Sequence, residues 1–106
     1  MEFVDACLLL DFYGQLLTER TRTVLEMHFS EDMSFSEIAE QEGISRQAIH
    51  DTIRRGLSSL EEYEKKLGLI RRFSEQKSTV RQAVDAMDKN NTAHARELLA
   101  GLYDIL

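Results

Sequence analysis

The feature that most limits the folds open to this chain is the complete absence of proline from its 106 residues. Folds built from many short strands need frequent turns, and proline is one of the residues that favour them. Glycine is also scarce, with 5 in the chain, whereas 42% of the residues are hydrophobic and can fill a core. This composition favours helices joined by brief polar corners, so we predict an all-α fold.

Cysteine and histidine are too few and too scattered for a disulfide framework or a metal centre. Cys7 is the only cysteine, so no disulfide can form within the chain, and a reducing compartment is expected. The histidines do not fall at metal-ligand spacings: His28, His50 and His94. The sequence also contains no phosphate-binding loop, nucleophile elbow or paired carboxylates. We therefore expect no metal, no cofactor and no enzymatic activity.

The apolar run near the N-terminus does not have the pattern of a signal peptide or a membrane anchor. Asp5 and Asp11 flank the run, and no Lys or Arg precedes it. It is also far shorter than the roughly 20 apolar residues that span a bilayer. The expected location is therefore the cytoplasm, without a membrane partner.

The hydrophobic periodicity predicts six helices. The first, Phe3 to Tyr13, is apolar almost all round, which is typical of a helix covered on more than one side. It is either the central core helix or a helix with one flank against a second subunit. The other helices are expected from Thr18 to about Phe29, from Ser34 to Glu42, from Ser45 to Leu67, from Leu69 to about Met87, and after Asn91.

Residues 1–68 are predicted to form one helical domain, and residues 69–106 a C-terminal helical extension that packs on the same unit. Large apolar residues recur at helical spacing in the fifth helix and are predicted to be its buried stripe: Ile70, Phe73, Val80, Val84 and Met87. The apolar residues of the last helix are Leu98, Leu99, Leu102, Tyr103, Ile105 and Leu106.

Residues 34–57 have the pattern of a helix-turn-helix. Ser34 and Glu37 have the spacing of a capping box, in which each side chain satisfies a backbone N–H of the other residue. Gly43 falls where the turn between the helices requires a positive φ, and Ser45 can cap the second helix. Plain helical corners share this spacing, so a packing role for the motif remains an alternative.

The outer face of the second helix is predicted to bind nucleic acid. Arg46 suits the edge of a guanine and Gln47 that of an adenine, whereas Arg54 and Arg55 suit backbone phosphates. The full set of predicted nucleic-acid-binding residues is Arg46, Gln47, His50, Arg54 and Arg55. Asp51 lies on the same face and leaves this helix with a local charge of only +2 (three Arg against one Asp).

The overall charge opposes nucleic-acid binding by a single copy. The chain has 13 Lys and Arg against 19 Asp and Glu, a net charge of -6. No segment is a basic patch of the kind that dominates affinity for nucleic acid. If DNA is the ligand, two copies are needed, which favours a homodimer. An acidic chain also suits a basic protein partner, so an adaptor role stays open.

The segment from Asp11 to Leu69 resembles the YlxM-type helix-turn-helix proteins of Gram-positive bacteria. The motifs that carry the resemblance are Phe12-Tyr13…Leu16-Leu17-Thr18, Ser45-Arg46-Gln47-Ala48-Ile49, Asp51, and Leu60-Glu61…Tyr63-Glu64…Leu67. This segment is also similar to region four of bacterial sigma factors, a more distant relative that reads promoter DNA with such a helix pair. The segment after Phe73 does not clearly follow the family pattern.

The resemblance implies an all-helical, dimeric, cytoplasmic protein. Members of the family are typically encoded beside the signal recognition particle GTPase and are thought to take part in, or regulate, that pathway. By motif match, the recognition-helix role falls to Arg46, Gln47, His50 and Arg54. The leading prediction is thus a DNA-binding regulatory protein of the signal recognition particle pathway. The alternative is an adaptor or effector that binds that particle's GTPase or its RNA and never reads DNA.

Overall fold

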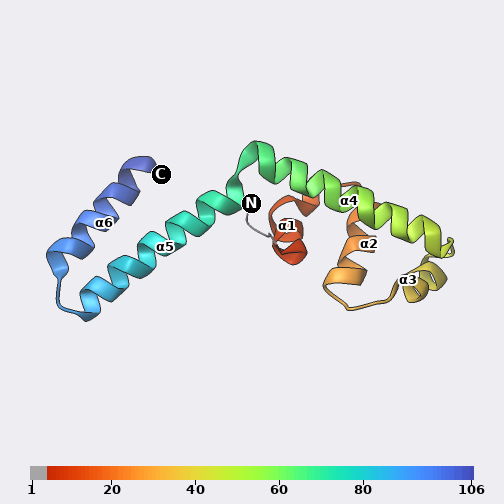
Figure 1. The fold of residues 1–106 in the computed structure, drawn as a ribbon, viewed down its shortest axis with the longest axis horizontal. Coiled ribbons are helices and arrows are strands. Elements are labelled where there is room, and N and C mark those ends of the chain that lie inside the picture. The colour runs from red at the N-terminus through yellow and green to blue at the C-terminus, as the bar shows by residue number, and fades with distance from the viewer. Residues whose placement is uncertain (1–4) are drawn as a thin grey trace. The chain divides into compact units, whose positions relative to one another are not determined.

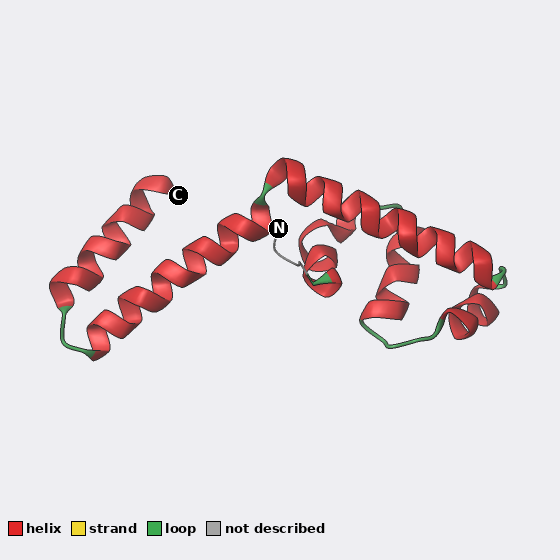
Figure 2. Ribbon diagram, viewed as in Figure 1, coloured by secondary structure: helices red, strands yellow, loops and turns green. Residues whose placement is uncertain are grey.

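The computed structural model describes residues 5–106, and helices make up most of this range (Figure 1). In chain order the elements are α1 (Ala6–Tyr13), the short 3-10 helix η1 (Gly14–Leu16), α2 (Glu19–Phe29), α3 (Phe35–Glu42), α4 (Arg46–Leu67), α5 (Leu69–Asp88) and α6 (Thr92–Ile105). Figure 2 shows helices and loops, and no strand occurs among the described residues. The all-α prediction is confirmed. Phe3 and Val4, expected in the first helix, lie outside the described residues.

The chain divides into two compact units, Met1–Ile70 and Arg71–Leu106. The first unit holds α1 to α4, and the second holds α6 and nearly all of α5. No helix within residues 5–106 has both the length and the apolar character needed to cross a membrane.

Side-chain caps fix where the helices of the first unit begin. The side chains of Thr18, Ser34 and Ser45 each accept a hydrogen bond from the backbone N–H three residues further on, at the starts of α2, α3 and α4. At Ser34 the capping box is complete, because its backbone N–H donates to Oε1 of Glu37 over 3.0 Å. Each cap satisfies an N–H that has no partner within the helix.

Residues with a left-handed backbone conformation fix where the helices end. Gly43 after α3 and Gly68 after α4 have φ of 68° and 63°, a conformation that glycine adopts without steric penalty. Asp32 and Asn90 lie in the same region with φ of 55° and 59°. Asp and Asn tolerate this region better than most residues, which explains the tight corners before α3 and α6.

The core of the first unit forms where α1, α2 and α3 pack against α4 (Figure 1). Its most deeply buried side chains come from all four helices: Leu9, Tyr13, Val24, Leu25, Ile38, Ile49 and Leu60. Leu8 and Phe12 of α1 also pack against this core while partly exposed. One flank of α1, which carries Leu9 and Tyr13, therefore belongs to the core of its own chain.

Gly56 marks the closest approach between α2 and α4. A Cβ atom at this position would lie 2.8 Å from Cδ1 of Leu25 and 3.0 Å from Cγ2 of Thr21. These distances are too short for real carbon–carbon contacts, so only glycine fits without a shift of its neighbours. The sequence pattern gave no indication of this role, because Gly56 lies inside a helix rather than at a corner.

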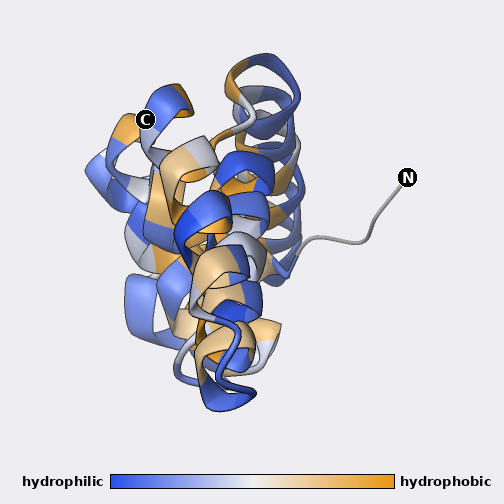
Figure 3. Ribbon diagram, turned by 90° about the vertical axis from the view of Figure 1, so that its left-hand side faces the viewer, coloured by the Kyte–Doolittle hydropathy of each residue, from blue (hydrophilic) through white to orange (hydrophobic). Residues whose placement is uncertain are grey.

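The second unit is a hairpin of α5 and α6 with a very small core. Its buried residues are three alanines, Ala83, Ala86 and Ala95, with Leu98 packed against them. The prediction for the buried stripe of the fifth helix is wrong beyond Ile70, because the larger residues of that stripe are exposed: Phe73, Val80, Val84 and Met87. Figure 3 shows hydrophobic positions alternating with hydrophilic ones along the helices. Alanines permit a close approach of two helices, so the small-residue side of α5 faces α6.

Candidate nucleic-acid interface

The helix-turn-helix consists of α3, a short turn and the first half of α4 (Figure 1). At the turn, the backbone N–H groups of Gly43 and Ile44 both bond to the carbonyl oxygen of Ala39. Ile49 and Ile53 are buried and hold α4 against α3 and α2. Because these two residues face inward, the polar residues between them are directed outward.

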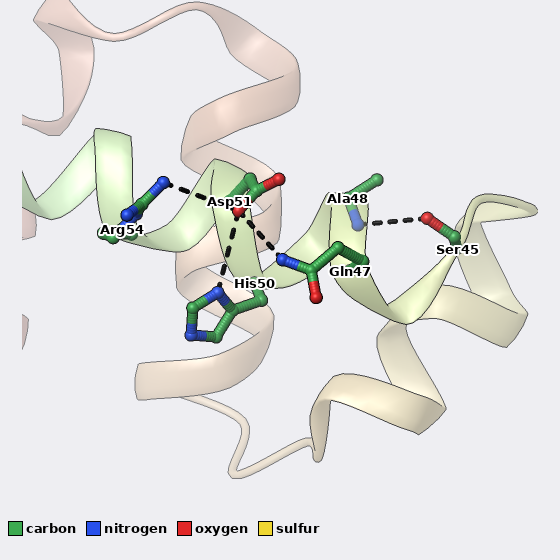
Figure 4. A network of polar contacts seen from close by, with 6 residues as sticks. All are labelled: Ser45, Gln47, Ala48, His50, Asp51 and Arg54. Atoms are coloured by element: carbon green, nitrogen blue, oxygen red, sulfur yellow. Dashed lines mark hydrogen bonds and ion pairs between the residues drawn. The ribbon is translucent and has the colours of Figure 1, made fainter.

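Ser45 fixes where α4 begins, because it caps the N-terminal end of this helix. Its Oγ accepts a 3.0 Å hydrogen bond from the backbone N–H of Ala48 (Figure 4). All of the residues predicted to bind nucleic acid are exposed in the first ten residues of α4: Arg46, Gln47, His50, Arg54 and Arg55. The sequence prediction therefore selected side chains that solvent reaches.

The carboxylate of Asp51 brings three of these side chains together. Its Oδ1 atom lies 3.2 Å from Nε2 of Gln47, 3.7 Å from Nδ1 of His50 and 3.6 Å from a terminal nitrogen of Arg54 (Figure 4). Arg46 and Arg55 are exposed on the same helix but do not belong to this group of contacts. Asp51 was expected only as a negative charge on this face, although its spacing from Gln47 and Arg54 is the spacing of helical neighbours.

A shallow depression of about 500 Å³ lies beside the same residues, lined by Phe35, Arg46, Gln47 and His50. The ring of Phe35 lies 5.7 Å from the ring of His50 and 4.8 Å from that of His28, measured between centroids. His28 is itself fixed, since its Nδ1 lies 2.8 Å from the carbonyl oxygen of Met33. Phe35 thus connects the exposed His50 to the packed interior, a role that sequence reasoning missed.

The charge of this face is positive but small. Arg46, Arg54 and Arg55 oppose Asp51, giving +2 on a chain whose net charge is -6. Within residues 5–106, no three His, Cys, Asp or Glu side chains gather in a way that would hold a metal ion. The face offers hydrogen-bond donors and acceptors, from Arg46, Gln47, His50 and Asp51.

Comparison with known proteins agrees with this architecture. The family model described as "Putative helix-turn-helix protein, YlxM / p13 like" (UPF0122) matches residues 3–99. A UPF0122 protein of Desulforamulus reducens is 42% identical over 105 residues, covering 99% of this chain and 90% of the relative. The UPF0122 protein STH1464 of Symbiobacterium thermophilum is 41% identical over 95 residues, covering 90% of this chain and 89% of the relative.

A third relative matches a shorter region more strongly. A UPF0122 protein of Acetivibrio thermocellus is 50% identical over 74 residues, covering 70% of this chain and 63% of the relative. The family model extends to residue 99, so the expectation that the segment after Phe73 departs from the family pattern is wrong. Together, the helix-turn-helix geometry and these matches confirm the resemblance found in the sequence. The chain belongs to the UPF0122 family of YlxM / p13-like helix-turn-helix proteins.

Proposed function

We propose that this protein is a DNA-binding regulatory protein that reads the major groove with the first turns of α4. The observation that carries the proposal is the exposed polar face of a helix fixed in place by a helix-turn-helix corner. Arg46 and Gln47, at the N-terminal end of that face, have the donors and acceptors that distinguish guanine and adenine. Arg54 and Arg55 are placed further along the helix, where phosphate contacts set the register of the protein on the duplex.

The small positive charge of this face supports action as a homodimer. Phosphate contacts provide most of the affinity for DNA, and a single face with a local charge of +2 makes few of them. Two copies double the contacts and read two half-sites on the same side of the duplex.

The exposed apolar residues of the α5–α6 hairpin support the same oligomeric state. They are Phe73, Val80, Val84, Met87, Leu99, Tyr103, Ile105 and Leu106, each exposed by 43% to 80%. Met87 and Leu99 line one depression, so part of this apolar surface from both helices lies on a common side. Burial of these residues against a second copy would remove exposed apolar surface from water, and a stable interface needs about 1,200 Å² or more in total. We propose that the α5–α6 hairpin of a second copy of the chain covers this apolar surface.

The family resemblance supports a place in the signal recognition particle pathway, in the cytoplasm. That resemblance rests on the motifs between Phe12 and Leu67, which include the recognition end of α4. The regulated target would then be a gene or transcript of that pathway, and no enzymatic activity is proposed.

Selection from a random double-stranded DNA library tests the proposal. The wild-type protein is expected to enrich a defined sequence, and the double variant Arg46→Ala, Gln47→Ala to lose that preference while keeping its helical content. Arg81→Ala with Gln82→Ala is the matched control, because it removes the same two residue types from an exposed part of α5. Retained sequence preference in the recognition-helix variant would show that the face is wrongly assigned.

A second candidate function is an adaptor that binds the signal recognition particle GTPase or its RNA without reading DNA. The observation that favours it is the excess of 19 acidic over 13 basic residues, which suits a basic protein surface better than a phosphate backbone. The GTPase rate with and without this protein, at several salt concentrations, separates the two candidates. An unchanged rate would count against a GTPase effector.

A further inference from the structure

Asp51 lies at the centre of a group of contacts on the exposed face of α4, because three separate side chains contact one of its oxygen atoms. Gln47 donates to Oδ1 from one turn before, Arg54 approaches it from one turn after, and His50 approaches from the adjacent position. The other carboxylate oxygen takes no part in these contacts and points away from them (Figure 4). Asp51 therefore offers a charged hydrogen-bond acceptor on a face whose other charged side chains are arginines.

These contacts have little value for the stability of the fold. All four side chains are substantially exposed to solvent, and exposed pairs of this kind contribute only about 0–1 kcal/mol. On a surface that approaches DNA, however, a carboxylate is repelled by phosphates and reduces the charge available from Arg54. A negative charge at this position thus weakens binding to DNA of any sequence, unless a base offers it a donor.

We propose that Asp51 is a specificity-determining residue whose carboxylate accepts a hydrogen bond from the exocyclic amino group of a base in the major groove. Cytosine N4 is the usual partner of a carboxylate, so the base read by Asp51 is cytosine. The same carboxylate positions Gln47 beside that base through the hydrogen bond at Oδ1. This inference rests on the proposed DNA-binding function and adds one base to what the face reads.

The experiment compares the wild-type chain with Asp51→Asn and Asp51→Ala by selection from a random double-stranded DNA library. Asp85→Asn is the matched control, because it removes the same charge from an exposed position on α5. The wild type and Asp85→Asn are expected to select cytosine at one position by about tenfold over other bases. Asn pairs with adenine, so Asp51→Asn should change that position from cytosine to adenine, and Asp51→Ala should lose the preference there.

Affinity for an unrelated duplex provides a second measurement. Asp51→Asn and Asp51→Ala are expected to bind it several-fold more tightly than the wild type, whereas Asp85→Asn is not. A steeper salt dependence, by about one counterion, would show that Arg54 has gained a phosphate contact.

The possible failures are distinguishable. If the wild type selects a defined site and Asp51→Asn selects the same site with the same strength, the role of Asp51 is overturned while DNA binding stands. If neither the wild type nor Asp85→Asn enriches any sequence, DNA reading itself fails, and the role of Asp51 falls with it. Circular dichroism of each variant verifies that the helical content is unchanged.

Discussion

The Tyr13 hydroxyl donates a 2.6 Å hydrogen bond to Oε1 of Glu64, 51 residues further along the chain. The same two side chains accept hydrogen bonds from the backbone at the start of α5. Leu69 N–H donates to the Tyr13 oxygen over 3.1 Å, and Ile70 N–H donates to Glu64 Oε1 over 2.9 Å. Because the first N–H groups of a helix have no partner within it, these bonds stabilise the junction between α4 and α5 and join it to α1.

Replacing Tyr13 with Phe is expected to lower the free energy of unfolding by about 1–3 kcal/mol. The ring is 1% exposed and would stay packed, but the donor to Glu64 and the acceptor for Leu69 N–H are lost. Urea denaturation followed by circular dichroism measures the change. Ser58→Ala is the control, because it removes a hydroxyl from an exposed position of α4 and should change the free energy of unfolding little.

The same tyrosine predicts how stability changes at alkaline pH. Burial, with a smaller contribution from the hydrogen bond to Glu64, raises the pKa of Tyr13 above its ordinary value of 10.0. The unfolded chain therefore loses this proton first, so the stabilisation is present below pH 10 and is lost as pH rises through the folded pKa. The midpoint of urea unfolding is measured at pH 9 and again above pH 10. Between these two pH values, the midpoint should fall less in Tyr13→Phe than in the wild type. An equal fall in both would contradict the assignment.

Gly56→Ala and Gly101→Ala are expected to change stability in opposite directions. At Gly56 the new methyl group meets Leu25 and Thr21 at 2.8–3.0 Å, so overpacking should cost about 1–3 kcal/mol. At Gly101, within α6, nothing lies within 4 Å of the new atom, and alanine should stabilise the helix by roughly 0.5–1 kcal/mol. Thermal or urea unfolding of the two variants gives both values. A neutral Gly56→Ala would mean that shifts of the Leu25 and Thr21 side chains, together with the higher helix propensity of alanine, offset the overpacking.

Removal of the Ser34 side chain is expected to change the titration of Glu37. The hydrogen bonds from Ser34, chiefly from its backbone N–H, hold the pKa of Glu37 below its ordinary value of 4.5. The capping box therefore contributes its full stabilisation above pH 4.5, and this stabilisation is lost as pH falls through the folded pKa of Glu37. Because alanine keeps the backbone N–H, an NMR titration of Ser34→Ala should show this pKa moved only part of the way towards 4.5. Glu61→Gln, on the exposed side of α4, is a control that should leave it unchanged.

The proposed dimer predicts a specific dependence on the α5–α6 hairpin. Light scattering at micromolar concentration should give twice the chain mass of 12.2 kDa for the wild type. Val84→Glu places a charge in the apolar patch and should give the monomer mass, because an unpaired buried charge is strongly unfavourable. Gln82→Glu adds the same charge at an exposed polar position of α5 and should remain dimeric. If the wild-type protein has the mass of a monomer under these conditions, the proposed dimer is contradicted.

Local signals in the sequence predicted the helix-turn-helix well. Ser34 and Ser45 begin helices and Gly43 ends one, because capping and positive φ depend on residues only a few positions apart. The exposure of the recognition face followed from the burial of Ile49 and Ile53 on the opposite side of α4.

Tertiary contacts could not be predicted in the same way. In α5, periodicity identified one face of large apolar residues, but a face of small residues such as Ala83 and Ala86 packs against α6 instead. Periodicity alone does not say which face meets a neighbour. Nothing near Glu64 in the sequence indicates its hydrogen bond with the distant Tyr13.

The packing of α1 to α3 against α4 also constrains how the protein folds during synthesis. Two of the most deeply buried side chains of the core, Ile49 and Leu60, belong to α4, and the Glu64 contact comes later still. A nascent chain that has just completed the turn at Gly43 still lacks α4, the helix against which α1, α2 and α3 all pack. The first unit therefore closes only after the end of α4 has left the ribosome, and a fragment limited to residues 34–57 should not fold alone.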